Sequence, residues 1–131
     1  MDAALHALLN TLVDATLDRD HSQIDQIYDF PITLVRPTGA QIFETAQEFV
    51  DELDRVSRAQ GVGIAAIHKE VLDSRHYPGG VRMVDVRFTF LDRNGKEVRS
   101  FVSTYVLRSE LDSLRISMHV SHNEILERPV V

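Results

Sequence analysis

The sequence predicts an α+β fold in which N-terminal helices pack on a strongly curved antiparallel sheet. Apolar residues recur at helical spacing in the N-terminal part of the chain, and from about residue 64 they alternate with polar residues, as in strands. Turn signals at Pro78-Gly79-Gly80, Asn94-Gly95 and residues 109–113 divide this second part into strands. The length of 131 residues suits one domain, and no repeat or linker interrupts it, so we expect a single domain over residues 1–131.

Two helices are expected near the N-terminus. The first covers residues 2–19, and its buried stripe would be Leu5, Leu8, Leu9, Leu12 and Thr16. The second starts near Ser22, whose hydroxyl can cap free backbone amides, and ends before Pro31, which lacks the amide that a helix interior needs. Its buried positions would be Ile24, Ile27 and Tyr28.

A small hairpin and a third helix follow. Residues 32–35 and 41–43 read as two short strands around the turn Pro37-Thr38-Gly39. The third helix begins at about residue 46, because the run Thr45-Ala46-Gln47-Glu48 matches a capping box, in which both terminal side chains accept hydrogen bonds from free amides. Gly61 is placed to end this helix in a left-handed conformation.

The remainder of the chain predicts long strands near residues 64–76, 81–92, 97–108 and 114–122. Strands joined by short turns pair antiparallel, which gives a meander with helices over one face. Asn94-Gly95 is the preferred two-residue hairpin turn, and it would pair Arg93 with Lys96. That pairing fixes the register of the two central strands.

The register sorts the side chains of the central strands onto two faces. The inward face holds Val84, Val86, Phe88, Phe90, Phe101, Ser103, Tyr105 and Leu107. The outer face holds Met83, Asp85, Arg87, Thr89, Leu91, Val98, Ser100, Val102, Thr104 and Val106. We expect the aromatic, inward face to pack on the helices, and Asp85 to pair with Arg87 or Thr104 rather than act as a buried base. The outer face is too apolar to be wholly solvated and predicts a homodimer, unless its valines are ordinary strand residues that nothing covers.

Composition excludes several classes of function. The chain has no cysteine, which excludes disulfides and thiolate chemistry and agrees with a reducing cytoplasm, where we expect the protein. The net charge is −6 with dispersed basic residues, so nucleic acid is not an expected partner. Residues 1–20 lack a basic leader and are interrupted by Asp and Asn, so neither a signal peptide nor a membrane span is expected. No nucleophile motif, phosphate-binding glycine loop or metal-ligand spacing is present, and no cofactor is expected.

Short runs along nearly the whole chain carry a family resemblance. They are Tyr28-Asp29-Phe30-Pro31, Phe43-Glu44-Thr45 with Glu48-Phe49, Val84-Asp85-Val86-Arg87-Phe88 with Asp92-Arg93-Asn94-Gly95, Ser103-Thr104-Tyr105-Val106-Leu107-Arg108, and His122-Asn123-Glu124. With the order of elements, they resemble the nuclear transport factor 2-like superfamily, which includes SnoaL-like polyketide cyclases and ketosteroid isomerases. The resemblance implies a cone-shaped, cystatin-like fold, usually dimeric, with a pocket between the concave sheet and the helices. It implies no single reaction, because the superfamily holds many, and the acid pair of a ketosteroid isomerase has no match here.

We therefore expect a domain that binds a small organic molecule in such a pocket. One alternative is an isomerase, cyclase or dehydratase that acts on a small apolar substrate with a carbonyl group; another is a non-catalytic protein-interaction module. Whether the chain is an enzyme stays open. The residues expected to line the pocket are Tyr28, Phe30, Phe88, Phe101 and Ser103.

Tyr105 and His122 are the polar groups expected to act in the pocket. The phenol of Tyr105 could donate a hydrogen bond to a carbonyl or enolate oxygen, or it could be a core group bonded to backbone. His119 and His122 are three residues apart on a strand and so point to opposite faces, which disfavours a metal site. If Leu114, Ile116, Met118 and Val120 face inward, His122 shares their side as a general acid or base and His119 points outward.

Overall fold

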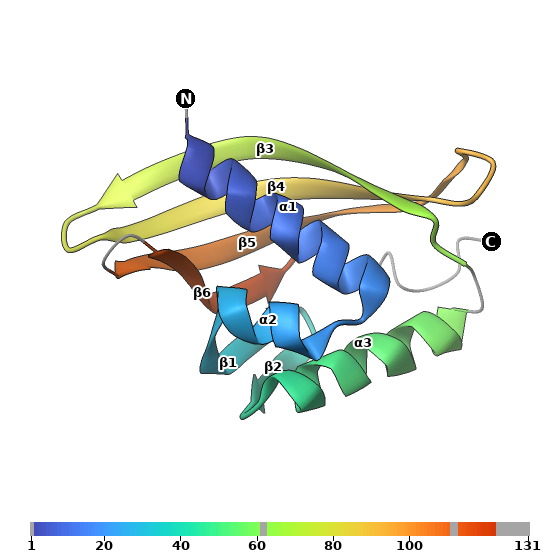
Figure 1. Cartoon of the computed structure of the whole chain (residues 1–131), viewed down its shortest axis with the longest axis horizontal. Helices are drawn as coiled ribbons and strands as arrows, with labels where there is room; N and C mark the ends of the chain where they lie inside the picture. The colour runs from blue at the N-terminus through green and yellow to red at the C-terminus, as the bar shows by residue number, and fades with distance from the viewer. Residues whose placement is uncertain (1, 61–62, 111–112, 123–131) are drawn as a thin grey trace.

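The computed structural model describes residues 2–60, 63–110 and 113–122. Within these ranges, three helices pack against one face of a six-stranded sheet, which confirms the predicted α+β class (Figure 1). Gly61, the expected end of the third helix, lies outside the described residues.

The helices are α1 (Ala3–Asp18), α2 (His21–Ile27) and α3 (Ala46–Gln60). The buried residues of α1 are Leu5, Leu8, Leu9, Leu12 and Ala15, so Ala15 replaces Thr16 in the predicted stripe. The Thr16 hydroxyl instead donates to the Leu12 carbonyl at 2.8 Å. The cap of α2 is Asp20 and not Ser22, because its carboxylate accepts from the amides of Ser22 and Gln23 at 3.0 and 3.4 Å.

The start of α3 is confirmed at Ala46. The Thr45 hydroxyl accepts from the Glu48 amide at 3.3 Å, and the Glu48 carboxylate accepts from the Glu44 amide at 3.2 Å. Glu48 therefore reaches one residue further back than in the predicted capping box, and both side chains satisfy amides that the helix leaves free.

The strands are β1 (Tyr28–Arg36), β2 (Gly39–Phe43), β3 (Ala66–Tyr77), β4 (Val81–Leu91), β5 (Glu97–Glu110) and β6 (Ser113–Ser121). They lie in the order β2-β1-β6-β5-β4-β3. The predicted hairpin and the predicted meander therefore form one sheet, joined by a parallel pairing of β1 with β6. All other neighbours are antiparallel, so the sheet is mixed.

The turn between β4 and β5 differs from the expected two-residue turn. The backbone amide of Asp92 donates to the carbonyl of Lys96 at 2.9 Å, and the amide of Gly95 donates to the carbonyl of Asp92 at 3.0 Å. The loop thus has three residues, Arg93, Asn94 and Gly95, and Gly95 has φ +78°. The Asp92 carboxylate favours this loop, since it accepts from the amides of Asn94 and Lys96 at 2.9 and 3.0 Å.

The predicted register of the central strands is nevertheless confirmed. An irregularity between Phe90 and Leu91 offsets the extra loop residue, so Val84 pairs with Tyr105 and Phe88 pairs with Phe101. Buried side chains accordingly alternate along β4. The inward face therefore carries the residues that the sequence assigned to it.

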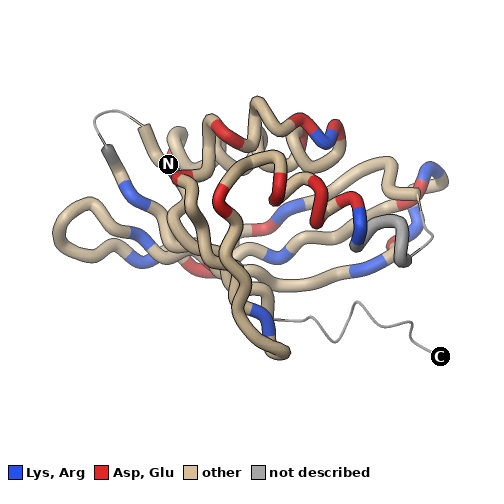
Figure 2. Tube along the Cα trace, turned by 90° about the horizontal axis from the view of Figure 1, so that it is seen from below, with Lys and Arg blue, Asp and Glu red and all other residues tan. Residues whose placement is uncertain are grey.

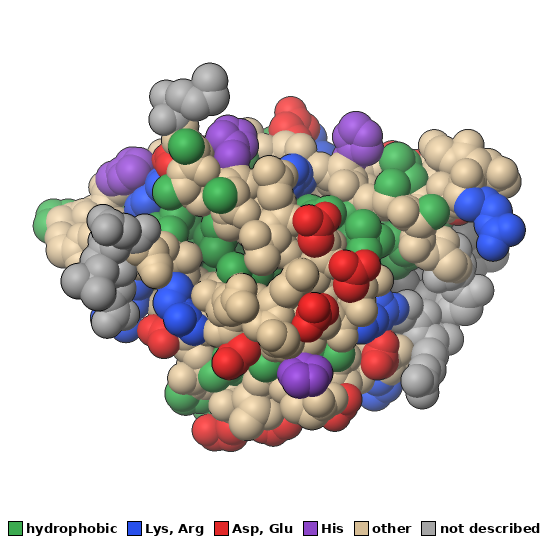
Figure 3. Space-filling model, in the orientation of Figure 1, with side chains coloured by type: hydrophobic (Ala, Val, Ile, Leu, Met, Phe, Trp, Pro, Cys, Tyr) green, Lys and Arg blue, Asp and Glu red, His purple; other side chains and the backbone are tan. Residues whose placement is uncertain are grey.

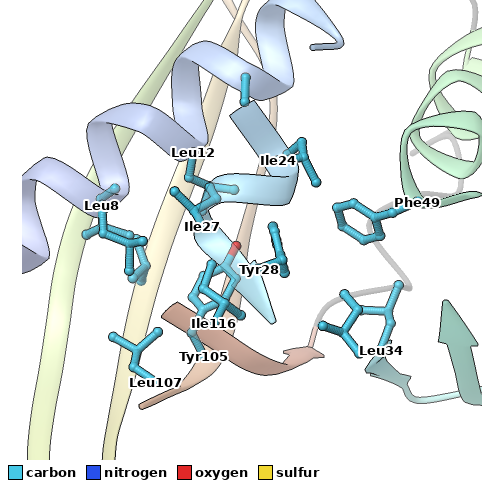
Figure 4. Packing of buried hydrophobic residues seen from close by; sticks show 14 of the residues in the cluster. Leu8, Leu12, Ile24, Ile27, Tyr28, Leu34, Phe49, Tyr105, Leu107 and Ile116 are labelled. Atoms are coloured by element: carbon cyan, nitrogen blue, oxygen red, sulfur yellow. The ribbon is translucent and has the colours of Figure 1, made fainter. Parts of the chain in front are cut away.

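The core lies between this inward face and the helices. Figure 4 shows Leu8 and Leu12 of α1 and Ile24 and Ile27 of α2 above Tyr105, Leu107 and Ile116, with Phe49 of α3 and Leu34 beside Tyr28. The chain brings aliphatic side chains from the first two helices to one end of the sheet. Aromatic side chains from β1, α3 and the central strands gather at the other, where a cavity remains.

Candidate functional site

A cavity of about 140 Å³ lies between the C-terminal half of α1, the middle of α3 and the inward face of the sheet. Its apolar wall includes Leu12, Leu34, Phe49, Leu53, Ile67 and Phe90. A cavity of about 150 Å³ engineered into another protein holds one benzene molecule. The space therefore suits a molecule of about one ring, and a molecule of several fused rings exceeds it.

The structure places Tyr28, Phe88 and Phe101 on the cavity wall, as the sequence predicted for these three. Phe30 lies behind the wall: its ring centroid is 5.8 Å from that of Tyr28 and 6.4 Å from that of Phe49. Ser103 is fully buried and lies outside the lining. Both residues support the wall instead of facing the space.

Tyr105 lies on the cavity wall in the middle of β5. Its ring is stacked on the His119 ring at 4.5 Å and meets the Phe88 ring edge-on at 6.2 Å. Burial raises the pKa of the Tyr105 hydroxyl well above its ordinary value, and a hydrogen bond with Ser103 offsets only part of this rise. The phenol is therefore neutral and keeps a proton to donate.

His119, and not His122, is the histidine of the cavity. The pairing of β5 with β6 shifts between Leu107, which faces Ile116, and Val106, which faces Met118. Ser117 is the extra residue of this bulge, and beyond it every side chain of β6 changes face. The prediction that His122 faces the pocket is therefore wrong, because it assumed a regular strand.

One nitrogen of the His119 imidazole makes a hydrogen bond within the protein, and the other is available to a ligand. Its Nε2 lies 3.0 Å from the Ser103 hydroxyl, while its buried Nδ1 has no hydrogen-bond partner among the described residues. Burial, and then the charges of Arg36 and His122, lower the pKa of His119 from 6.5 to about 3. The ring is neutral at physiological pH and can give or accept a hydrogen bond, depending on its tautomer.

His122 belongs to a polar chain on the outer face. The hydroxyl of Thr104 lies 2.6 Å from the Asp85 carboxylate and 2.6 Å from the Nε2 of His122. The predicted pairing of Asp85 with Thr104 is confirmed, whereas Arg87 pairs with Glu70 at 3.4 Å instead. Thr104 is buried although it lies on the face that the helices leave uncovered.

Charged side chains also line the cavity, and the sequence reasoning did not single them out. They are Arg19 after α1, Arg36 at the end of β1, Glu52 on α3 and Arg99 on β5. Glu52 follows Phe49 by three residues, which places both on one helical face, and Arg99 has the same parity as Phe101 and Tyr105. These two spacings are the features of the sequence that could have predicted Glu52 and Arg99 on the cavity wall.

Among the described residues, no group of three or more His, Asp or Glu side chains could hold a metal ion. None of the described helices is long and apolar enough to cross a membrane.

The structure is similar to several solved structures. An NTF-2 like protein of unknown function from Silicibacter pomeroyi is 18% identical with a TM-score of 0.66, over 91% of this chain and 92% of that one. A domain of unknown function with a cystatin-like fold from Nostoc punctiforme is 11% identical with a TM-score of 0.71, over 99% and 78%. A ketosteroid isomerase-like protein from Erwinia carotovora atroseptica is 13% identical with a TM-score of 0.65, over 92% and 93%. At these identities the likeness shows a common fold.

A search of curated proteins finds no match. A family model described as NTF2-like protein (DUF6841) matches residues 1–124. The match spans the helices, the whole sheet and the cavity between them. The chain is therefore a member of this NTF2-like family, and its fold is the α+β cone that the sequence predicted.

Proposed function

We propose that this protein binds a small organic molecule in the cavity between α1, α3 and the sheet. The observation that carries the proposal is an apolar space of about 140 Å³ with two neutral polar rings, Tyr105 and His119, side by side on its wall. Ligand pockets are typically apolar with a few converging polar groups, and this combination fits that description. The absence of cysteine is in keeping with a protein of the cytoplasm.

An isomerase, cyclase or dehydratase acting on a small carbonyl compound is the second candidate. The neutral Tyr105 phenol favours it, since such a donor can stabilise a developing oxyanion. The base would be His119, in the position that the sequence had assigned to His122. A base with a pKa of about 3 removes protons poorly at neutral pH, so the site supports binding better than catalysis.

We also infer that the outer face contacts a second copy of the chain. Val102, Val106, Met118 and Val120 are only partly buried on this face, and the helices lie on the opposite side of the sheet. Apolar surface of this kind gains stability from being covered. A module that binds a different protein through the same face is the alternative, and it would leave the purified chain monomeric.

The test is a crystal structure of protein purified without added ligand, combined with ligand-observed NMR against neutral and charged single-ring compounds. We expect density or binding beside Tyr105 and His119. Replacing Val13, a cavity residue on α1, by Phe should abolish binding, whereas Thr11→Phe on the same helix should not. A cavity closed by its own side chains, with no compound bound, would contradict the proposal.

A further inference from the structure

The arginines of the cavity wall have partners within the protein. Figure 3 shows acidic side chains on the helical side of the molecule, and in Figure 2 basic residues lie mainly along the strands. The Arg36 guanidinium donates to Glu52 of α3 at 3.1 Å, and Arg19 donates to Asp54 of the same helix at 2.6 Å. The guanidinium carbon of Arg99 lies 5.1 Å from the centroids of two phenylalanine rings. An uncharged ligand can therefore occupy the space beside these side chains.

His119 brings an unsatisfied polar atom to the same wall. Its ring lines the cavity, and its buried Nδ1 has no hydrogen-bond partner among the described residues. The stack on Tyr105 and the contact of Nε2 with Ser103 hold the ring in this orientation. A buried nitrogen without a partner costs stability and is uncommon in folded proteins. A hydrogen bond to a bound molecule would remove that cost.

The neighbours of His119 decide whether Nδ1 carries a proton. The Ser103 hydroxyl has one proton and lies 3.0 Å from the Nε2 of His119. The same hydroxyl forms a hydrogen bond that lowers the pKa of the Tyr105 phenol, which is the effect of a donor to the phenol oxygen. Since Ser103 gives its proton to Tyr105, it accepts from His119, and Nε2 carries the proton of the neutral ring. The Nδ1 then has a free lone pair that accepts a hydrogen bond.

Aromatic side chains from β1, α3, β4 and β5 line the same cavity. The ring of Phe88 meets that of Tyr105 edge-on at 6.2 Å and lies tilted to that of Phe101 at 5.7 Å. The rings of Tyr28 and Phe49 are 5.0 Å apart. Tilted and edge-on rings attract one another at separations of about 4.5 to 7 Å. A flat aromatic ligand can join such an arrangement, whereas a saturated ring lacks these contacts.

We propose that the cavity takes a neutral, single-ring aromatic molecule with a hydroxyl group, which donates its proton to the Nδ1 of His119 while the ring lies among the aromatic side chains. This rests on the proposed function and names its ligand class. The volume of about 140 Å³ limits the molecule to about one ring. An ether or a ketone of the same size lacks the donor and would leave the nitrogen unsatisfied.

The experiment titrates the full chain with phenol and 3-methylphenol and follows binding by NMR. Each is compared with the analogue in which fluorine replaces the hydroxyl group, because fluorine keeps a similar size and cannot donate. We expect each phenol to bind about tenfold or more tightly than its analogue, since the analogue leaves a buried acceptor unpaired. His119→Phe keeps a flat ring and should abolish this preference while changing the affinity for the fluorinated compounds little.

A second measurement covers the case in which His119→Phe fails to fold. The nitrogen-15 shifts of the His119 ring in the wild-type protein should show a proton on Nε2 and none on Nδ1. Phenol should then shift the Nδ1 signal more than the Nε2 signal. A proton found on Nδ1 in the free protein would overturn the inference.

His122→Phe is the matched control, because it makes the same substitution on the outer face, where His122 contacts Thr104. It should leave every affinity unchanged. Fluorinated compounds that bind as tightly as the phenols would overturn this inference and leave the binding proposal standing. No binding by any phenol, fluorinated compound or other single-ring molecule would overturn both. Cyclohexanol that binds as tightly as phenol would reject the aromatic class.

Discussion

His119 and Tyr105 stack on the cavity wall, and burial keeps both of them neutral. Burial disfavours the charged form of each group, so it lowers the pKa of the imidazole and raises the pKa of the phenol. The charged side chains on the cavity wall are instead Arg19, Arg36, Glu52 and Arg99. Any pH dependence of ligand binding near neutrality should follow the ionisation of the ligand.

We expect the ring resonances of His119 to stay unchanged from about pH 8 to about pH 4.5, because its pKa is about 3. The folded pKa lies below the ordinary value of 6.5, so the unfolded chain binds this proton first as the pH falls. The neutral ring thus contributes full stability above pH 6.5 and progressively less toward pH 3.

Two-dimensional NMR of the histidine rings would follow this titration, with His119→Gln assigning the signal. The stability of His119→Gln should depend less on pH between about 6.5 and 4.5 than that of the wild type. A His119 midpoint near pH 6.5 would show that water reaches the imidazole.

At the scale of the elements, caps and turns decide where each helix and strand begins. Asp20 caps α2, Thr45 and Glu48 cap the start of α3, and Asp92 accepts two amides inside the loop between β4 and β5. These bonds are local in sequence, so the boundaries that they set were predicted to within a few residues. The side chain that makes the bond was harder to predict, as Asp20 in place of Ser22 shows.

Thr45→Ala should destabilise the protein by about 1 kcal/mol, because it removes the acceptor for the Glu48 amide at the start of α3. Urea unfolding followed by circular dichroism measures the change. Thr11→Ala is the control, since Thr11 lies inside α1 and its hydroxyl only donates to the Ala7 carbonyl. Equal losses in the two variants would argue against a capping role.

Gly95→Ala should cost about 1 to 2 kcal/mol. Gly95 has φ +78°, which alanine rarely adopts, and among the described residues no atom beyond its chain neighbours lies within 4 Å of the added carbon, so the cost is conformational and not steric. Gly63→Ala is the control, because that glycine has equal space and no positive φ. Thermal unfolding measures the loss of stability in both variants. An unchanged stability in Gly95→Ala would mean that the loop adopts another turn.

At the scale of the whole molecule, the sheet separates two surfaces with different roles. The inward face and the helices enclose the cavity, while the outer face combines valine and methionine side chains with the chain of Asp85, Thr104 and His122. The bulge at Ser117 serves both surfaces, since it sends His119 to the cavity and Met118 and Val120 to the outer face.

Val106→Lys should convert the expected homodimer to a monomer. Val106 lies on the outer face between Met83 and Met118, so a lysine there would face either the same lysine of the second copy or apolar side chains. Light scattering after size-exclusion chromatography should give about twice 14.9 kDa for the wild type and 14.9 kDa for the variant.

Ile42→Lys is the control, because Ile42 is an exposed apolar residue on the edge strand β2 and away from the outer face of the central strands. It should stay dimeric. A monomeric wild type would instead favour the binding of a different protein through this face.

The sequence by itself determined the α+β class, the presence and order of the helices and strands, the register of β4 with β5 and the inward position of Tyr105, although Tyr28, expected in the second helix, begins β1. Each depends on contacts between near neighbours in the chain, such as a helical stripe, a capping box or a hairpin turn. Tertiary structure decided the parallel pairing of β1 with β6, the bulge that exchanges His119 and His122, and the gathering of Arg19, Arg36 and Arg99 around one cavity. These depend on packing between segments far apart in the chain, which no local pattern specifies.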